Sequence, residues 1–457
     1  MKKYDIQPTE ENIRESLNKN ITGRNENIYQ LLQLLNHQEG SWSIAINGDW
    51  GSGKTFFVKQ CKYVLDYLNS SVNCKNEIIK IFDEKKLDDI NKKPFRTVYY
   101  DAWEHDNETD PIQSLLACIA TSKWAVSLKK VLIPVLTAGL RLVEMLTPIK
   151  TDKIVETINK QIQNYKDKEI DFEKLKKEFY NALTKLAPED GQLIVFVDEL
   201  DRCKPTYAIK LLERIKHYFS VPNITFIFSV DLSQLQNTAK RYYGEKFDGY
   251  HYLDRFFDLV INLPEPDLEK YLENRDGMLV INNLFDSNSE NYCTLFCKDL
   301  IIHFSFSLRQ INHFYLKTNF ATYNSLNDTL NKNRGTNQRN GLLIIYVFLL
   351  PFMCALNQAD IDEYNKFING TASDNTLSFL ANNSQFDTFC KRSVFDDSKD
   401  EIDMLELVKE IYDALFNPME SKDLLKISNN AYIDRLSTRR SSLINACSLL
   451  NSNTKLD

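Results

Sequence analysis

The sequence has few of the residues that interrupt helices. Among its 457 residues are only 13 glycines and 12 prolines, whereas asparagine and lysine are abundant. Because glycine and proline disfavour helix interiors, this composition favours a mostly helical protein. The chain also lacks an excess of positive charge, since its formal net charge is -7 and its pI is about 5.6. This balance does not support wholesale nucleic-acid binding and restricts DNA contact to a local basic groove.

Cysteine pairs with metal-ligand spacing are missing. The nine cysteines are scattered, and the closest pair, Cys293 and Cys297, has helical spacing rather than a C-x-x-C motif. Free buried thiols in a reducing cytosol fit this pattern better than a zinc site. Residues 1–5 lead to no apolar core of a secretion signal, so a cytoplasmic location is expected.

Neither of the two main apolar stretches is long enough to cross a membrane. Residues 124–149 contain an uncharged run of only ten residues, Val131–Leu140, whereas a span takes about 20. The uncharged run Leu342–Leu356 has fifteen residues and contains Pro351. We expect buried helices in both places, and residues 124–149 are also a candidate for peripheral membrane contact.

One glycine-rich stretch carries the strongest chemical signal. A short apolar run, Ser43–Asn47, leads into Gly48-Asp49-Trp50-Gly51-Ser52-Gly53-Lys54-Thr55 and then Phe56. This is the full G-x-x-x-x-G-K-T pattern of a phosphate-binding loop (P-loop), placed between a predicted strand and a predicted helix that runs to about Leu68. A chance match in a glycine-containing turn is the alternative, and the flanking elements disfavour it.

Each residue type in this loop suits part of a nucleotide. Gly48 and Gly53 are expected to adopt positive φ and to bring backbone N–H groups against a phosphate. Lys54 supplies a mobile positive charge for the β- and γ-phosphates, and the Thr55 hydroxyl is a hard oxygen ligand for Mg²⁺. A helix that begins at about Gly53 directs its positive end to the same anion. The stretch predicts a nucleotide-binding site made by Gly48 to Phe56.

A second stretch has the features of the strand that accompanies such a loop. Residues Leu193–Val197 predict a buried parallel strand that ends in Asp198 and Glu199. Asp198 suits Mg²⁺, directly or through water, and Glu199 suits polarisation of the attacking water. A local ion pair is the simplest interpretation of Asp201 and Arg202.

Polar side chains also follow two further predicted strands, at residues 96–100 and 224–230. They are Asp101, Trp103 and Glu104 after the first, and Ser229 and Asp231 at the end of the second. Because open α/β sheets place chemistry at the carboxyl ends of their strands, we expect the first group to line the cleft. A capping cluster is the structural alternative for that group. Ser229 and Asp231 are candidate sensors of the γ-phosphate.

The chain divides into three predicted parts. These are a helical lead-in at residues 1–40, a nucleotide-binding core at 41–264 with a helical insert at about 112–186, and a helical lid or partner domain at 265–457. In the last part, the Asn-rich residues 324–341 predict a loop or disorder. Residues 357–400 predict a loop-rich region, which a short helical tail follows.

Together these motifs resemble the KAP P-loop NTPases, a branch of ATPases with an additional strand between the two Walker strands. The likeness covers roughly residues 20–320. The motifs that carry it are the P-loop, Asp101-Ala102-Trp103-Glu104, Asp198-Glu199-Leu200-Asp201-Arg202-Cys203, Val230-Asp231 and Tyr252-Leu253-Asp254-Arg255. The resemblance implies an α/β fold with a mostly parallel sheet in 5-1-4-3-2 order. It also implies ATP as the nucleotide, Mg²⁺ held by Thr55 and Asp198, and Glu199 as the water-activating base.

The resemblance suggests further site residues and partners. Arg255, before the last predicted strand, and Arg309, in the helical lid, are placed like arginines that contact the γ-phosphate, often across subunits. Gly23 and Arg24 form a turn that lies over the adenine in related ATPases. Surface or capping roles are the alternative for these residues. Bacterial family members are associated with phage defence, so a homo-oligomer and a separate effector are the expected partners.

Three functions follow from these observations. An ATPase would couple ATP binding and hydrolysis to assembly or to control of a partner. A nucleotide-gated switch would turn ATP over rarely, and a membrane-associated factor would use residues 124–149. The adjacent carboxylates Asp198 and Glu199 favour the ATPase. An N-K-x-D motif for guanine does not occur, and the sequence has no obvious acceptor site of a small-substrate kinase.

Overall fold

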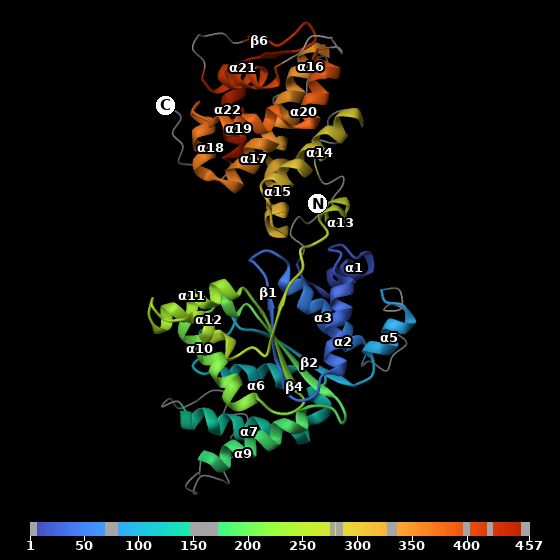
Figure 1. The fold of residues 1–457 in the computed structure, drawn as a ribbon, viewed down its shortest axis with the longest axis vertical. Helices are drawn as coiled ribbons and strands as arrows, with labels where there is room; N and C mark the ends of the chain where they lie inside the picture. The colour runs from blue at the N-terminus through green and yellow to red at the C-terminus, as the bar shows by residue number, and fades with distance from the viewer. Residues whose placement is uncertain are drawn as a thin grey trace. The chain divides into compact units, whose positions relative to one another are not determined.

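The computed structural model describes residues 7–68, 81–146, 172–274, 279, 287–326, 336–395, 403–417 and 424–448. The chain forms two compact units, which divide between Tyr271 and Leu272. The division falls within helix α13, Leu268–Glu273. Figure 1 shows a twisted sheet covered by helices in the first unit and an assembly of helices in the second.

A parallel sheet forms the centre of the first unit. Its strands, in spatial order, are β2 (Phe95–Asp101), β3 (Gln192–Asp198), β4 (Ile224–Val230), β1 (Ser43–Asn47) and β5 (Leu259–Asn262). Each neighbouring pair is parallel. Counted from the other edge this is the 5-1-4-3-2 order, so the predicted fold is confirmed. Every residue of β3 and β4 is buried, as both faces of a parallel sheet are covered.

Alternate strand residues point to two separate cores. On one face, Ile44 and Ile46 pack with helices that precede or follow β1, whereas Ala45 belongs to the opposite core. The helices of the first core are α1 (Glu10–Lys19), α2 (Asn25–His37), α3 (Lys54–Leu68) and α5 (Glu84–Ile90). The helices of the second core are α6 (Pro111–Thr121), α7 (Lys129–Leu146), α9 (Phe172–Leu183), α10 (Pro205–Arg214), α11 (Leu232–Tyr243) and α12 (Gly249–Asp254).

The predicted helical insert contains α6, α7 and α9. Leu132 of α7 is buried in the second core. Gly139 lies so close to α6 that an added Cβ would stand 2.3 Å from Leu116 Cδ1. Neighbouring helices therefore cover the apolar face of α7, as expected for a buried helix, and membrane contact through residues 124–149 stays a prediction. Residues 147–171 of the insert lie outside the described part of the chain.

The second unit is mainly helical. Its elements are α14 (Ser287–His303), α15 (Leu308–Leu326), α16 (Thr336–Leu343), η7 (Ile344–Leu349), α17 (Leu350–Ala359), α18 (Ile361–Ile368), α19 (Asp374–Ala381), α20 (Ser384–Phe389), η8 (Cys390–Val394), α21 (Met404–Phe416), β6 (Leu424–Lys426), β7 (Tyr432–Asp434) and α22 (Leu436–Cys447). β6 and β7 form an antiparallel pair within the tail that was expected to be helical.

The centre of this unit is a continuous apolar helix, Asn340–Ala359. Its most apolar 18-residue window has a mean hydropathy of 2.0, and among the described residues it is the one helix long and apolar enough to cross a membrane. The expectation that this stretch is too short for a span is therefore wrong, because the helix extends beyond the uncharged run on both sides. However, 83% of its most apolar window is buried inside the protein. The prediction of a buried helix over Leu342–Leu356 is therefore confirmed.

Two loop predictions for this unit are wrong. Residues 336–341 belong to α16, and residues 357–400 contain α18, α19, α20 and η8, whereas residues 327–335 lie outside the described part. The short helices begin with side-chain caps, because Asp360, Ser373 and Asn383 accept hydrogen bonds from backbone N–H groups of the first turn. Asn, Asp and Ser favour both loops and helix caps, and here they serve as caps.

Candidate functional site

The carboxyl ends of three strands bring polar side chains into one row. Asp101 of β2 is in register with Asp198 of β3, which is in register with Ser229 of β4. On the other side of β4, Ser229 is level with Ile46 of β1, just before the P-loop begins. The P-loop and the acidic residues after β3, far apart in the sequence, therefore lie at the same carboxyl end of the parallel sheet, with β4 between their strands.

The P-loop glycines serve two different purposes. Gly51 and Gly53 have φ values of 84° and 94°, which confirms the prediction for Gly53. The prediction of positive φ for Gly48 is wrong. Gly48 is needed for space, because an added Cβ would stand 3.0 Å from Ser52 Oγ and 3.4 Å from Leu263 Cβ. The loop can therefore fold back over its own first residue.

Lys54 begins α3, and its ammonium group lies inside the P-loop. Nζ donates hydrogen bonds to the carbonyl oxygens of Gly48 (2.6 Å) and Asp49 (3.1 Å). Burial lowers the pKa of Lys54, while the surrounding carboxylates, Asp201 foremost, act to raise it. The ammonium and the N-terminus of α3 thus both present positive charge at the P-loop, where a phosphate is a stronger partner than a carbonyl.

Within the described part of the chain, two buried hydroxyl groups at this edge have no hydrogen-bond partner. They are Ser52 Oγ in the loop and Ser229 Oγ at the end of β4. Buried polar atoms are normally partnered, so these two fit a site that a nucleotide phosphate and its hydrated metal ion complete. The hydroxyl of Thr55 and the carboxylate of Asp198 are hard oxygen ligands of the type that Mg²⁺ takes.

Asp198 is buried and held by two donors. The Tyr99 hydroxyl donates to Oδ2 over 2.8 Å, and the backbone N–H of Glu199 donates to Oδ1 over 3.0 Å. Burial, and then the charge of Asp198, raises the pKa of Tyr99, so the phenol keeps the proton that it donates. Sequence reasoning missed Tyr99. Its signal is its place two residues before Asp101, which puts both side chains on one face of β2.

Glu199 lies beside the P-loop. The Thr55 hydroxyl donates to Glu199 Oε1 over 3.4 Å, and Arg202 forms an ion pair with Oε2. Burial, followed by the charge of Asp198, raises the pKa of Glu199 to about 7, whereas Arg202 opposes that rise. Glu199 has a φ of 59°, and non-glycine residues in this strained region cluster at functional sites.

Asp201 and Arg202 have different partners, so the local ion pair expected between them is wrong. The Trp50 indole Nε1 donates to Asp201 Oδ2 over 2.5 Å. Arg202 pairs with Glu199 and lies over the ring of Trp103, with its Cζ 5.5 Å from the ring centroid. These contacts connect the turn after β3 to the P-loop on one side and to the end of β2 on the other.

Comparison with known protein families agrees with this geometry. A model of the KAP family P-loop domain matches residues 24–330, more than half of the chain. The chain belongs to the KAP family of P-loop domains. Membership implies nucleotide binding through the P-loop, and the family assigned from the motifs is confirmed. A search of curated proteins found no match.

Two of the predicted site residues of the KAP domain act as caps, namely Asp101, predicted to line the cleft, and Asp231, a candidate sensor of the γ-phosphate. Asp101 Oδ1 accepts hydrogen bonds from the backbone N–H groups of Trp103 (3.1 Å) and Glu104 (3.2 Å), whose side chains are exposed. Asp231 Oδ1 accepts from two backbone N–H groups in the first turn of α11, over 3.0 and 3.2 Å. The capping alternative therefore accounts for Asp101, and the role of Asp231 as a sensor of the γ-phosphate stays a prediction.

Arg24 joins the P-loop of the KAP domain to the segment after β5. Its buried guanidinium donates from Nη1 to Ser52 O over 2.8 Å and from Nε to Pro264 O over 2.9 Å. Burial lowers the pKa of Arg24 to about 10. The preceding Gly23 has a φ of 71°, and an added Cβ would stand 2.5 Å from Asp267 Cβ. Arg24 supports the loop backbone, and its contact with adenine stays a prediction.

The two other predicted arginines lie on exposed surfaces. Arg255 follows α12, four residues before β5, and its side chain is exposed. Arg309 belongs to α15 in the second unit and is exposed as well. The structure thus brings Lys54, Thr55, Asp198 and Glu199 together, and the γ-phosphate roles of the two arginines stay predictions.

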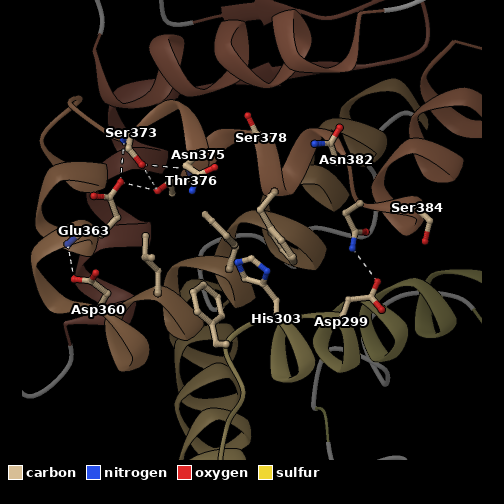
Figure 2. A pocket seen from close by; sticks show the side chains of 15 residues that line it. Asp299, His303, Asp360, Glu363, Ser373, Asn375, Thr376, Ser378, Asn382 and Ser384 are labelled. Atoms are coloured by element: carbon tan, nitrogen blue, oxygen red, sulfur yellow. Dashed lines mark hydrogen bonds between the residues drawn. The ribbon is translucent and has the colours of Figure 1, made fainter.

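The second unit contains a cavity of about 770 Å³ (Figure 2). Three lining residues are carboxylates, Asp299, Asp360 and Glu363. Glu363 accepts hydrogen bonds from the Thr376 hydroxyl (2.6 Å) and from a backbone N–H at the start of α19 (2.9 Å), and these donors lower its pKa to about 2. Asp360 caps α18, and Asp299 accepts from Asn383. These carboxylates hold helix ends in place and are not candidates for acid–base chemistry.

Proposed function

We propose that the chain is a Mg²⁺-dependent ATPase that couples ATP binding and hydrolysis to assembly or to control of a partner protein. The observation that carries this proposal is the 3.4 Å contact between Thr55 Oγ1 and Glu199 Oε1. It places the hydroxyl suited to Mg²⁺ against the carboxylate suited to orient water. Asp198, fixed by Tyr99, lies next to them. A loop that only bound phosphate would need neither carboxylate.

Each residue of the site has a separate role in the proposed hydrolysis. Lys54 and the N–H groups of the P-loop bind phosphate oxygens. Thr55 and Asp198 would hold Mg²⁺, which neutralises charge on the phosphates when it is bound. Glu199 orients a water molecule and accepts its proton as the water oxygen bonds to the γ-phosphorus and the bond to the leaving ADP oxygen breaks.

The proposal also includes the nucleotide, the location in the cell and the biological role. The resemblance to bacterial KAP proteins supports ATP over GTP and a role in phage defence beside a separate effector, and the scattered cysteines support a cytoplasmic location. The adjacent genes test that setting. A neighbouring nuclease or other effector is expected, and a neighbourhood without any effector gene would remove the support for defence.

Phosphate release by the purified protein tests the activity. We expect release from ATP that requires Mg²⁺, and Lys54→Ala should reduce it on the order of 10² to 10³-fold because a positive charge at the phosphates is lost. Lys62→Ala is the matched control, since Lys62 lies in the same helix and pairs with Asp66. A Lys54→Ala protein as active as the Lys62→Ala protein would refute the proposed site.

A nucleotide-gated switch with little turnover is the second candidate. The ion pair between Arg202 and Glu199 favours it, because a carboxylate held by a cation is less free to accept a proton. Size-exclusion chromatography with ATP and with ADP distinguishes the two functions. Assembly driven by ATP without phosphate release would replace the ATPase with the switch.

A further inference from the structure

Arg202 lies between the carboxylate of Glu199 and the ring of Trp103. Its Nε forms the ion pair with Glu199 Oε2, and its Cζ is 5.5 Å from the ring centroid of Trp103. The Arg202 side chain is 25% exposed and that of Glu199 is 15% exposed. A guanidinium with a carboxylate on one side and an aromatic face on the other has little freedom to move.

Each of the two carboxylate oxygens of Glu199 has its own side-chain partner. Oε1 accepts from Thr55 in the P-loop, and Oε2 meets Arg202 in the turn after β3. Because these partners belong to different elements, rotation of the carboxylate is restricted. The backbone N–H of Arg202 also donates to the carbonyl of Glu199 over 3.1 Å, which closes the turn that brings the two side chains together.

Trp103 is itself tied to the end of β3. The backbone N–H of Ala102 donates to the carbonyl of Asp198 over 2.9 Å and extends the pairing of β2 with β3. The next N–H, that of Trp103, donates to Asp101 Oδ1 over 3.1 Å. The indole is 52% exposed, so burial in a core does not explain its place. Its contact with Arg202 does.

We propose that Arg202 is a positioning residue for Glu199 and that Trp103 keeps Arg202 in place. The proposal rests on the proposed ATPase function, in which Glu199 orients the attacking water. Arg202 holds Oε2 and thereby turns Oε1 toward Thr55, the side on which the phosphates would lie. Since Arg202 is not part of the P-loop, its loss should affect turnover and leave nucleotide binding intact.

Turnover and nucleotide affinity of Arg202 variants test this role. Arg202→Ala should lower kcat about 10- to 100-fold, because a misplaced base loses its alignment with the reacting atoms. The Kd of a fluorescent ATP analogue should stay unchanged, and Arg202→Lys, which keeps the charge, should recover part of kcat. In a Glu199→Gln background, Arg202→Ala should cause no further loss, since the two residues act as a unit.

Arg214 offers a matched control. It pairs with Asp110 over 3.1 Å and its Cζ lies 5.7 Å from the ring centroid of Tyr218, so Arg214→Ala removes the same kinds of contact away from the site. That variant should keep kcat within about twofold of wild type, as expected for a distant, independent position. A readout independent of turnover is acrylamide quenching of Trp103 fluorescence in nucleotide-free protein, with Trp103→Phe identifying its share. Quenching should increase in Arg202→Ala.

The outcomes distinguish failure of the positioning role of Arg202 from failure of the proposed ATPase function. If Glu199→Gln keeps full turnover, the assignment of Glu199 fails and the role of Arg202 fails with it. If Glu199→Gln loses turnover while Arg202→Ala behaves like Arg214→Ala, only the positioning role is overturned. Faster turnover by Arg202→Ala would also overturn it and would favour the switch, because Arg202 would then restrain the carboxylate.

Discussion

The carboxylates at the edge of the sheet and those around the cavity of the second unit have opposite surroundings. At the sheet edge, burial and the like charge of Asp198 raise the pKa of Glu199 to about 7. In the second unit, hydrogen bonds from Thr376 and Ser373 lower the pKa of Glu363 to about 2 (Figure 2). The residue type is the same, and the neighbouring donors and charges differ.

Under the proposed function, this difference separates a reactive carboxylate, Glu199, from a structural one, Glu363. Crowding like charges in a buried place costs free energy, so its occurrence at the end of β3 points to chemistry. A carboxylate surrounded by donors is stabilised in its charged form and fastens the elements that supply those donors. Glu363 fastens α18 to α19 in this way, whereas Glu199 has one hydroxyl and one cation as side-chain partners.

The largest expected contrast is between Glu199→Gln and Glu363→Gln. Glu199→Gln should lower ATP turnover on the order of 10³-fold, because an amide cannot accept the proton of the attacking water. Glu363→Gln should leave turnover unchanged. Steady-state phosphate release measures both, and a comparable loss in the two variants would end the distinction between the sites.

The Tyr99 hydroxyl, which donates a hydrogen bond to Asp198, should affect the Mg²⁺ concentration that the protein needs for turnover. Tyr99→Phe removes the hydroxyl that orients this carboxylate and should raise the Mg²⁺ concentration for half-maximal turnover about tenfold. The adjacent Tyr100 is a control, because its hydroxyl lies in the second core and bonds with Ser114. Tyr100→Phe should not change the Mg²⁺ titration. Superimposable curves for Tyr99→Phe and wild type would show that this donor does not orient the metal ligand.

Glu363 should stabilise the second unit only where it is ionised. Its folded pKa of about 2 lies below the ordinary value of about 4.3, so its contribution is complete above that value and is lost as pH falls toward 2. Glu363→Gln should lower the free energy of unfolding by about 1 to 3 kcal/mol near pH 7, and by progressively less between about pH 4 and pH 2. Urea unfolding across this range measures the difference.

The control for that experiment is Glu410→Gln, since Glu410 is exposed on α21. It should change the free energy of unfolding by less than about 0.5 kcal/mol at every pH. A difference between Glu363→Gln and wild type that did not vary with pH would mean that the charge of Glu363 is not what holds α18 to α19.

The smallest effect is expected at Asp231, which caps α11 within the cleft. Asparagine is as good a cap as aspartate, so Asp231→Asn should keep turnover within about twofold and stability within about 0.5 kcal/mol. Phosphate release and thermal unfolding measure the two. A tenfold or larger loss of turnover would place Asp231 among the residues that sense the phosphate.

The parts of the site that could be predicted consist of characteristic residues that lie close together in the sequence. The P-loop is a continuous motif, and Asp198 with Glu199 directly follows an apolar strand. These residues predict the chemistry from the sequence alone, and the motifs indicated the family, which supplied the order of the strands. Long-range pairing of strands has no local signal, so without that resemblance the strand order would not have followed.

The contacts that shape the site could not be predicted, because they depend on side-chain direction between distant segments. Tyr99 reaches Asp198 from the neighbouring strand, and Trp50 reaches Asp201 from the P-loop. Arg202 pairs with Glu199 across a turn in which residue 199 has a left-handed backbone, which the sequence does not signal. The short helices of the second unit were missed for another reason, since their caps have the same composition as loops.

The nucleotide retained by Glu199→Gln after incubation with ATP and Mg²⁺ tests the central claim most directly. We expect the variant to bind ATP and keep it unhydrolysed, so that chromatography of the denatured protein recovers ATP, whereas the wild type yields ADP. Recovery of ADP from Glu199→Gln in wild-type amounts would contradict the assignment of hydrolysis to the edge where the P-loop meets β3.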